Sequence, residues 1–358
     1  MKQVLISGYL GFNNYGDEAL LFVIIKNLLG LGVRRENITV ISNDVPLTSG
    51  NYKVNAVNRW NLFSVIDSIT KNDLLIFIGG VFQDKTSFKS FLFYFFQLFM
   101  AGLLGKKVLL LGAGIGPFQR RISQVLFNFG VGNIDLISVR DQGSAELIPH
   151  KNNVLTTCDL VWGVEFDDSF KKSVKGINWN VPILGISLRQ DRYLKTPQMS
   201  AFAEKLSRIV NGMKDWQIIL IPCMKEDLGI LYELYDIISK KVSELNRIII
   251  LENFTDLPIQ QQIGIMSNCN AIIGMRYHAL LTALSNQKPV FGLIYDQKVK
   301  ALVEFASQVG ISFKDDLEQP WNYFWQNLQY SEEKAKLSRE KAIQLNKINI
   351  DVLIKCLA

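Results

Sequence analysis

The sequence predicts an α/β protein with two Rossmann-like domains, and three observations support this prediction. Short apolar runs alternate with helical stretches along the chain, which is typical of parallel sheets covered on both faces. A polar segment at residues 167–180 interrupts this alternation, which then begins again. The length of 358 residues is sufficient for about two domains. We expect a ligand-binding cleft between the two domains.

The predicted strands are nearly continuous runs of Val, Ile and Leu. In the first half they cover residues 4–9, 38–43, 74–80, 107–114 and 136–141, and helices are expected at 18–31, 62–70, 87–104 and 121–129. In the second half the strands cover 183–189, 218–224, 248–253, 271–276 and 289–295, with helices at 198–213, 228–242, 259–268 and 277–285. The predicted division is a first domain at 1–172, a second at 181–330 and a C-terminal helix at 331–358.

Composition excludes several classes of protein. Hydrophobic residues make up 48% of the chain and charged residues 20%, so a long disordered arm is excluded. The four cysteines are widely separated and the only histidines are His150 and His278, so we expect no metal site, no disulfide framework and no cofactor. A net charge of +6 is compatible with nucleic acid, a membrane surface or an anionic small substrate as partner, but no long basic run is present, so no nucleic-acid patch is visible in the sequence. The N-terminus does not resemble a signal peptide, and we expect a cytoplasmic protein.

One uncharged stretch raises the question of a membrane. Residues 91–105 are rich in Phe and lie between Lys89 and Lys106. They are too few to span a bilayer, which needs roughly 20 apolar residues. A core helix is the favoured interpretation, and a peripheral contact with the bilayer interface remains open.

Two glycine-containing segments in the first half follow strands at the edge where α/β proteins bind ligands. The segment at 8–18 (GYLGFNNYGDE) and the segment at 79–84 (GGVFQD) offer hydrogen-bonding groups suited to hydroxyl-rich ligands. The alternative for the first segment is a helix cap alone. The candidate acceptor-binding residues are Asn14, Asp17, Glu18, Gln83 and Asp84.

A third glycine-rich segment, GAGIGP at 112–117, also follows a strand. It lacks the GxGxxG spacing of a dinucleotide-binding turn, and the chain has no Walker A loop. We therefore expect a tight packing turn there.

The strongest candidate cluster is cationic. Gly274, Arg276 and His278 lie where an apolar strand passes into a helix, whose N-terminus attracts anions. Lys298 follows the next strand, whereas Arg140 and Arg189 end strands in the first and second halves. Together these residues are candidates for binding an anionic donor, and His278 can exchange a proton near neutral pH.

These segments, with SVRD at 138–141 and GMRYHALLTALSNQKPVFGLIYDQKV at 274–299, resemble the polysaccharide pyruvyl transferase family over residues 1 to about 305. The resemblance implies a GT-B-like fold and transfer of a pyruvyl group from phosphoenolpyruvate to a sugar, forming a cyclic ketal and releasing phosphate. The acceptor would belong to a cell-surface polysaccharide or its lipid-linked precursor and contact the first domain. The resemblance also implies His278 as the proton-transfer residue and Arg276, Arg140 and Lys298 as donor contacts. Tyr277 stands where family members commonly carry Leu.

Two other functions remain open on the residues alone. A GT-B-type glycosyltransferase would use a nucleotide-sugar donor, with Glu252 or Asp256 near the ribose. A non-catalytic anion- or glycan-binding protein would use the same cations without turnover.

Overall fold

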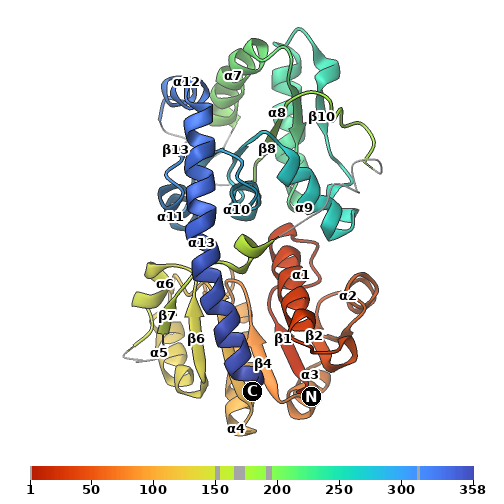
Figure 1. The fold of residues 1–358 in the computed structure, drawn as a ribbon, viewed down its shortest axis with the longest axis vertical. Coiled ribbons are helices and arrows are strands. Elements are labelled where there is room, and N and C mark those ends of the chain that lie inside the picture. The colour runs from red at the N-terminus through yellow and green to blue at the C-terminus, as the bar shows by residue number, and fades with distance from the viewer. Residues whose placement is uncertain (1, 150–153, 165–173, 191–195, 313–314) are drawn as a thin grey trace. The chain divides into compact units, whose positions relative to one another are not determined.

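The computed structural model consists of two compact units (Figure 1). Unit 1 contains Met1–Gly163 and Ala342–Ala358, and unit 2 contains Val164–Lys341. The structure describes residues 2–149, 154–164, 174–190, 196–312 and 315–358. His150 and residues 167–173 of the polar segment predicted at 167–180 lie outside the described residues.

Unit 1 has a seven-stranded parallel sheet in the order β3-β2-β1-β4-β5-β6-β7. The strands are β1 (Val4–Ser7), β2 (Ile38–Ser42), β3 (Asn55–Asn58), β4 (Leu74–Phe77), β5 (Lys107–Ala113), β6 (Leu136–Val139) and β7 (Val154–Thr156). The helices are α1 (Tyr15–Gly30), α2 (Val45–Tyr52), α3 (Leu62–Lys71), α4 (Phe88–Leu103), α5 (Arg121–Gly130) and α6 (Gln142–Glu146). Helix α4 contacts both α3 and α5, and their apolar residues share one core with alternate residues of the strands.

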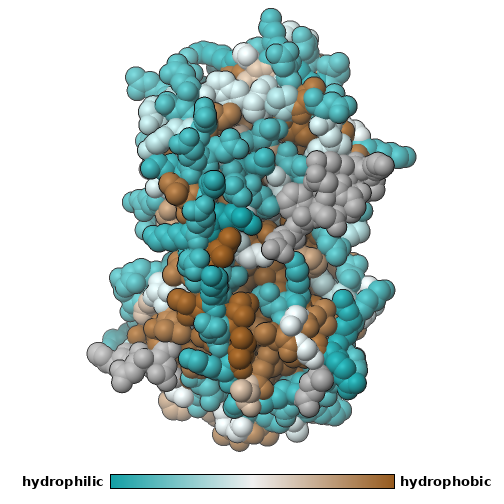
Figure 2. Space-filling view, in the orientation of Figure 1, coloured by the Kyte–Doolittle hydropathy of each residue, from teal (hydrophilic) through white to brown (hydrophobic). Residues whose placement is uncertain are grey.

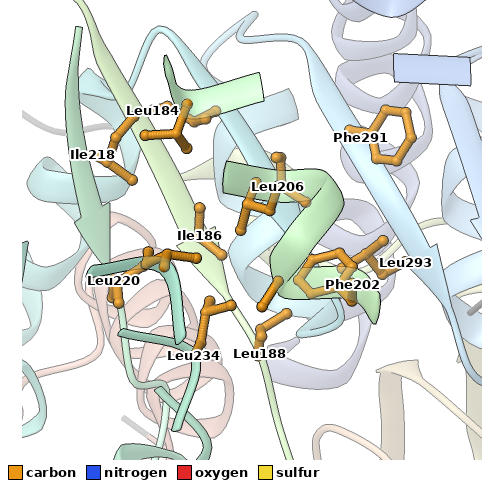
Figure 3. Close-up of a cluster of buried hydrophobic side chains, with 14 of the residues drawn as sticks. Leu184, Ile186, Leu188, Phe202, Leu206, Ile218, Leu220, Leu234, Phe291 and Leu293 are labelled. Atoms are coloured by element: carbon orange, nitrogen blue, oxygen red, sulfur yellow. The ribbon is translucent and has the colours of Figure 1, made fainter. Parts of the chain in front are cut away.

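Unit 2 has a six-stranded parallel sheet in the order β10-β9-β8-β11-β12-β13. The strands are β8 (Ile183–Ser187), β9 (Gln217–Leu220), β10 (Ile248–Ile250), β11 (Ala271–Gly274), β12 (Val290–Ile294) and β13 (Val309–Ser312). The helices are α7 (Thr196–Gly212), α8 (Leu228–Ser239), α9 (Ile259–Asn268), α10 (Tyr277–Ser285), α11 (Gln297–Phe305) and α12 (Glu318–Gln326). Figure 3 shows part of the core of this unit, where Ile186 and Leu220 of the sheet lie near Leu206 of α7 and Leu234 of α8. The long C-terminal helix α13 (Leu328–Leu357) contributes residues to both units.

Both sheets have the strand order of a Rossmann fold, which runs outward from the first strand in two directions. The predicted class of two Rossmann-like α/β domains is therefore confirmed. The prediction omitted β3, β7 and β13, which occupy sheet edges. Each is short, and β3 begins and ends with Asn, so none has the long apolar run that marks a central strand.

The Phe-rich stretch forms α4, which Ser87 caps by accepting a hydrogen bond from the backbone N–H of Ser90 at 3.3 Å. Phe91, Tyr94, Gln97, Leu98 and Ala101 are buried, so one side of the helix belongs to the core. Other residues of α4, such as Phe99 and Leu103, are exposed. Among the described residues, no helix has both the length and the apolar character needed to cross a membrane.

Candidate active site

In each unit the strand order reverses between two central neighbours, at a topological switch point. This point lies between β1 and β4 in unit 1 and between β8 and β11 in unit 2. Ligands of open α/β sheets bind at the carboxyl ends of the strands flanking such a point. The predicted acceptor segments follow β1 and β4, whereas Arg189 follows β8 and both Arg276 and His278 follow β11. The topology thus groups the predicted residues within each unit.

Arg276 is held by a carboxylate that the sequence analysis did not identify. Its Nε donates to Asp227 Oδ2 at 2.9 Å, and its Nη2 donates to Asp227 Oδ1. Asp227 also accepts hydrogen bonds from the backbone N–H groups of Cys223 and Met224, each at 3.1 Å. Burial opposes the charge of Arg276, but the hydrogen bonds and charge of Asp227 outweigh burial and raise the pKa of the guanidinium. Arg276 is therefore a fixed cation, with 14% of its side chain exposed.

Arg276 is the N-cap of α10, and His278 is the second residue of that helix. Both side chains are half-buried, and the His278 imidazole meets the Tyr277 ring edge-on, with ring centroids 5.0 Å apart. Buried Gly274 ends β11, and a Cβ there would lie 3.2 Å from Leu280 of α10. The lack of a side chain at Gly274 thus lets α10 pack closely on its own strand and places His278 at the sheet edge.

Two more cations follow the strands beside β11. Arg189 donates through Nη1 to the Tyr295 hydroxyl at 3.1 Å, and its guanidinium carbon lies 5.0 Å from the centroid of the Tyr295 ring. Burial raises the pKa of Tyr295 to about 12, so the phenol stays protonated. Lys298 lies at the start of α11, where its Nζ is 3.7 Å from the carboxylate of Asp296, the N-cap of that helix. Each cation has a neighbour that orients it.

Arg140 follows β6 in unit 1 and is slightly more enclosed than Arg276. It forms ion pairs with Asp159 at 3.3 Å and Asp141 at 3.4 Å, with 11% of its side chain exposed. A Cβ at Gly114, in the GAGIGP segment, would lie only 2.7 Å from Arg140 Nη2. Gly114 is therefore required for the guanidinium to lie flat against the chain.

The segment after β1 uses its polar residues to fix its own shape. Asn14 caps α1 by accepting a hydrogen bond from the backbone N–H of Gly16 at 3.3 Å, and its amide donates to the carboxylate of Asp17. Glu18 is buried and accepts hydrogen bonds from the backbone N–H of Gly11 at 2.9 Å and the hydroxyl of Tyr52 at 2.8 Å. Burial raises the pKa of Glu18, and this effect exceeds that of the two hydrogen bonds.

The segment after β4 shows the same use of an acidic group. Asp84 is buried and accepts hydrogen bonds from the backbone N–H groups of Gln119 and Arg120 and from the Ser123 hydroxyl. Burial acts to raise the pKa of Asp84, but these hydrogen bonds together lower it. Gln83 is half-buried and exchanges hydrogen bonds with Thr86, each 3.1 Å long.

The functional residues that the sequence analysis missed are the partners of the predicted cations. Asp227 lies 49 positions before Arg276 in the sequence, and Tyr295 lies 106 positions after Arg189. A signal existed for Tyr295, which begins the Tyr-Asp-Gln-Lys sequence that contains Lys298. No local pattern marks Asp227 as the partner of an arginine that follows another strand.

A model of the polysaccharide pyruvyl transferase family matches residues 14–297. The chain belongs to this family. The match includes every predicted site residue except Lys298, which lies one position beyond its end.

One relative of this chain is the amylovoran biosynthesis protein AmsJ of Erwinia amylovora, which is 23% identical over 373 residues, or 94% of this chain and 86% of AmsJ. UDP-GlcNAc 2-epimerase of Neisseria meningitidis, solved with UDP-GlcNAc, has a TM-score of 0.67 at 13% identity, covering 99% of this chain and 100% of its own. HepE of Anabaena, solved with UDP-glucose, has a TM-score of 0.60 at 13% identity, covering 99% of each chain. At these identities the structural likeness shows the fold alone, which is GT-B-like.

Proposed function

We propose that this protein transfers a pyruvyl group from phosphoenolpyruvate to two hydroxyls of one sugar, forming a cyclic ketal and releasing phosphate. Membership of the family, together with the cations around the switch point of unit 2, carries this proposal. AmsJ is named for amylovoran biosynthesis, which supports a role in glycan biosynthesis. We propose that the acceptor belongs to a cell-surface polysaccharide or its lipid-linked precursor.

The donor carries a carboxylate and a phosphate, and both need cationic partners. Asp227 occupies Nε and one N–H of Nη2 of Arg276, which leaves Nη1 and the second N–H of Nη2 to bind a donor oxygen. Arg189 and Lys298 supply further positive charge after β8 and β12, the strands on either side of β11, and Gly274 keeps the N-terminus of α10 close to the sheet. We assign Arg140, which lies in unit 1, as a further donor contact on the basis of the motif.

The reaction begins when His278 gives a proton to the methylene carbon of phosphoenolpyruvate, which becomes a methyl group. The neighbouring carbon becomes electron-deficient, and the oxygen of the first sugar hydroxyl bonds to it. The bond from this carbon to the phosphate oxygen then breaks, and the second hydroxyl closes the ketal. One hydroxyl proton replaces the proton that His278 gave, and the other leaves with the phosphate. No oxidant or reductant is needed.

On the acceptor side we propose two kinds of role. Asn14, Asp17 and Gln83 are half-buried and lie on the segments flanking the switch point of unit 1, where they can reach sugar hydroxyls. Glu18 and Asp84 are buried and accept hydrogen bonds from their own surroundings, so we assign them to holding these segments in shape. A Cβ at Gly79 would lie 3.3 Å from Asp17 Oδ1, which shows how closely the two segments approach.

We place the reaction in the cytoplasm, where phosphoenolpyruvate is formed, with a peripheral contact to the membrane that would carry a lipid-linked acceptor. On the face drawn in Figure 2, apolar residues gather over the unit that carries α1 and β4, whereas unit 2 is mainly hydrophilic. Helices α4 and α5 contain no acidic residue and begin beside basic ones. Their exposed apolar residues are Leu92, Phe99, Leu103, Ile122, Val125 and Phe129.

Flotation with vesicles tests this contact. The protein is expected to float with vesicles containing anionic phospholipid, and a Val125→Ser/Phe129→Ser variant is expected to remain behind. Tyr232→Ser, at an exposed aromatic residue of unit 2, serves as the control. Equal flotation of all three proteins would contradict the assignment of α5.

The reaction itself is tested with phosphoenolpyruvate carrying ¹³C in its methylene group. With a lipid-linked or polymeric glycan acceptor, the expected product contains a labelled methyl group on a ketal carbon, in equal amount to the phosphate released. Phosphate release without label in the glycan would contradict the proposal. A glycosyltransferase would instead consume a nucleotide sugar. Asp256, one of the two carboxylates considered for binding the ribose of such a donor, forms an ion pair with Lys225 at 3.0 Å.

A further inference from the structure

Arg59 is a buried arginine that the proposed reaction does not use. It follows the edge strand β3 in unit 1, and only 5% of its surface is exposed. Five aromatic rings surround its guanidinium carbon, with centroids 4.6–6.0 Å away. In order of increasing distance they belong to Phe93, Phe12, Trp60, Tyr94 and Tyr9.

The rings attract the charge of Arg59 but do not satisfy its hydrogen-bonding groups. Its Nε and Nη1 are buried and have no hydrogen-bond partner. Among the residues that the structure describes, no ion pair with a carboxylate is formed by Arg59. A buried guanidinium that lacks a carboxylate partner costs free energy. The Tyr94 hydroxyl interacts with Arg59, but burial raises the pKa of Tyr94 to about 12, so this oxygen carries no charge near neutral pH. The cluster therefore lacks one component, an oxyanion.

The position of the cluster relates it to the acceptor segments. Tyr9 and Phe12 lie in the segment after β1 that also carries Asn14 and Asp17, and their rings stack with centroids 4.0 Å apart. Phe93 and Tyr94 belong to α4, which follows β4. The cluster thus lies at the carboxyl edge of the first sheet, beside the switch point of unit 1.

Trp60 gives the cluster a face toward solvent. Its ring is 70% exposed, and its indole N–H donates to Asn43 Oδ1 at 2.8 Å. An exposed flat ring held at one edge is suited to stacking against the apolar face of a sugar. Since Nε and Nη1 of Arg59 are buried, a ligand reaches them only when one of the other surrounding rings moves aside, while Trp60 keeps its place as the stacking surface.

We propose that Arg59 and Trp60 form a subsite for an acidic sugar unit, in which the sugar ring stacks on Trp60 and a carboxylate or phosphate accepts hydrogen bonds from Arg59. This inference rests on the proposed function, because it assigns the subsite to the acceptor glycan. The acceptor is therefore anionic near the sugar that receives the pyruvyl group.

Binding to the full chain, measured by calorimetry without phosphoenolpyruvate, tests the subsite. The probes are glucuronic acid, glucose 1-phosphate and neutral glucose. Both acidic sugars are expected to bind more tightly than glucose, and the tighter of the two identifies the group as carboxylate or phosphate. Arg59→Gln is expected to weaken the acidic sugars roughly 10-fold or more and to abolish their advantage over glucose, since it removes a charge-assisted hydrogen bond.

Trp60→Ala is expected to weaken all three sugars several-fold. The matched control is Phe63→Ala, whose ring is 87% exposed and lies outside the five rings around Arg59, so it should bind like the wild type. If Arg59→Gln does not fold, Trp60→Ala still tests the subsite. Wild-type binding by Trp60→Ala, an unchanged preference in folded Arg59→Gln, or no binding of acidic sugars would each overturn the proposal. Because the assay involves no turnover, its outcome is independent of the donor reaction.

Discussion

The two switch points use acidic residues in different ways. In unit 1, Glu18 and Asp84 are buried and accept hydrogen bonds from neighbouring N–H and O–H groups, so they determine the shape of the segments that contain them. In unit 2, Asp227 and Asp296 lie against Arg276 and Lys298, which remain partly exposed. At the switch point of unit 1 acidic groups therefore stabilise the loops, whereas at that of unit 2 they also orient cations. Substitutions of Glu18 and Asp84 should affect mainly stability, whereas substitution of Arg276 should affect both stability and the use of the donor.

The largest effect is expected at His278. His278→Gln keeps a hydrogen-bonding side chain but removes the acid, so turnover should fall roughly 10²–10⁴-fold with the donor affinity little changed. Rates of phosphate release and donor titrations measure the two quantities. Tyr277→Leu, which introduces the residue common in the family, is the control and should stay close to wild type. A His278→Gln enzyme with most of its turnover would move the proton-transfer role to another residue.

Variants of Arg276 distinguish its role in donor binding from its contribution to stability. Arg276→Met should raise the KM for phosphoenolpyruvate about 10-fold or more, because a charged hydrogen-bonding group is lost. It also leaves buried Asp227 without its cation, which costs up to about 3–5 kcal/mol of unfolding free energy. The double variant Arg276→Met/Asp227→Leu should regain much of that stability in urea unfolding while its KM remains high. Recovery of both quantities would mean that Arg276 does not contact the donor.

Glu18 and Asp84 should show opposite pH dependence. The folded-state pKa of Asp84 is lowered, so its stabilising contribution is complete above its ordinary pKa and disappears as pH falls through the lowered value. Asp84→Asn should therefore cost about 1–3 kcal/mol at pH 7 and less in acid. The pKa of Glu18 is raised, so wild type should lose stability relative to Glu18→Gln as pH rises. Urea unfolding between pH 3 and 8 measures both slopes, and parallel slopes would contradict the contrast.

The smallest effect is expected at Gly114. Gly114→Ala places a methyl group against the Arg140 guanidinium and should raise the KM for phosphoenolpyruvate a few-fold, if Arg140 binds the donor as proposed. Gly132→Ala is the matched control, because nothing lies within 4 Å of a Cβ at that position. Equal KM values for the two variants would remove Arg140 from the donor site.

The sequence alone predicted the central strands and the residues that follow them. A buried parallel strand needs an apolar run, and the polar residues after such runs collect at one edge of the sheet. For this reason Arg276, His278 and Arg189 could be assigned to one edge of unit 2 before strand order was known. The edge strands β3, β7 and β13 escaped prediction because they are short and have no long apolar run.

Only the tertiary structure decided which groups these residues meet. Whether a carboxylate supports a loop or holds a cation depends on contacts between distant segments, as with Asp227 and Arg276, which follow different strands. The aromatic rings around Arg59 come from three parts of the chain, and nothing in the local sequence at Arg59 indicates that Phe93 of α4 lies 4.6 Å away. The physical reason is that apolar periodicity specifies where a strand or helix forms, whereas strand order and helix packing determine which polar groups share a buried environment.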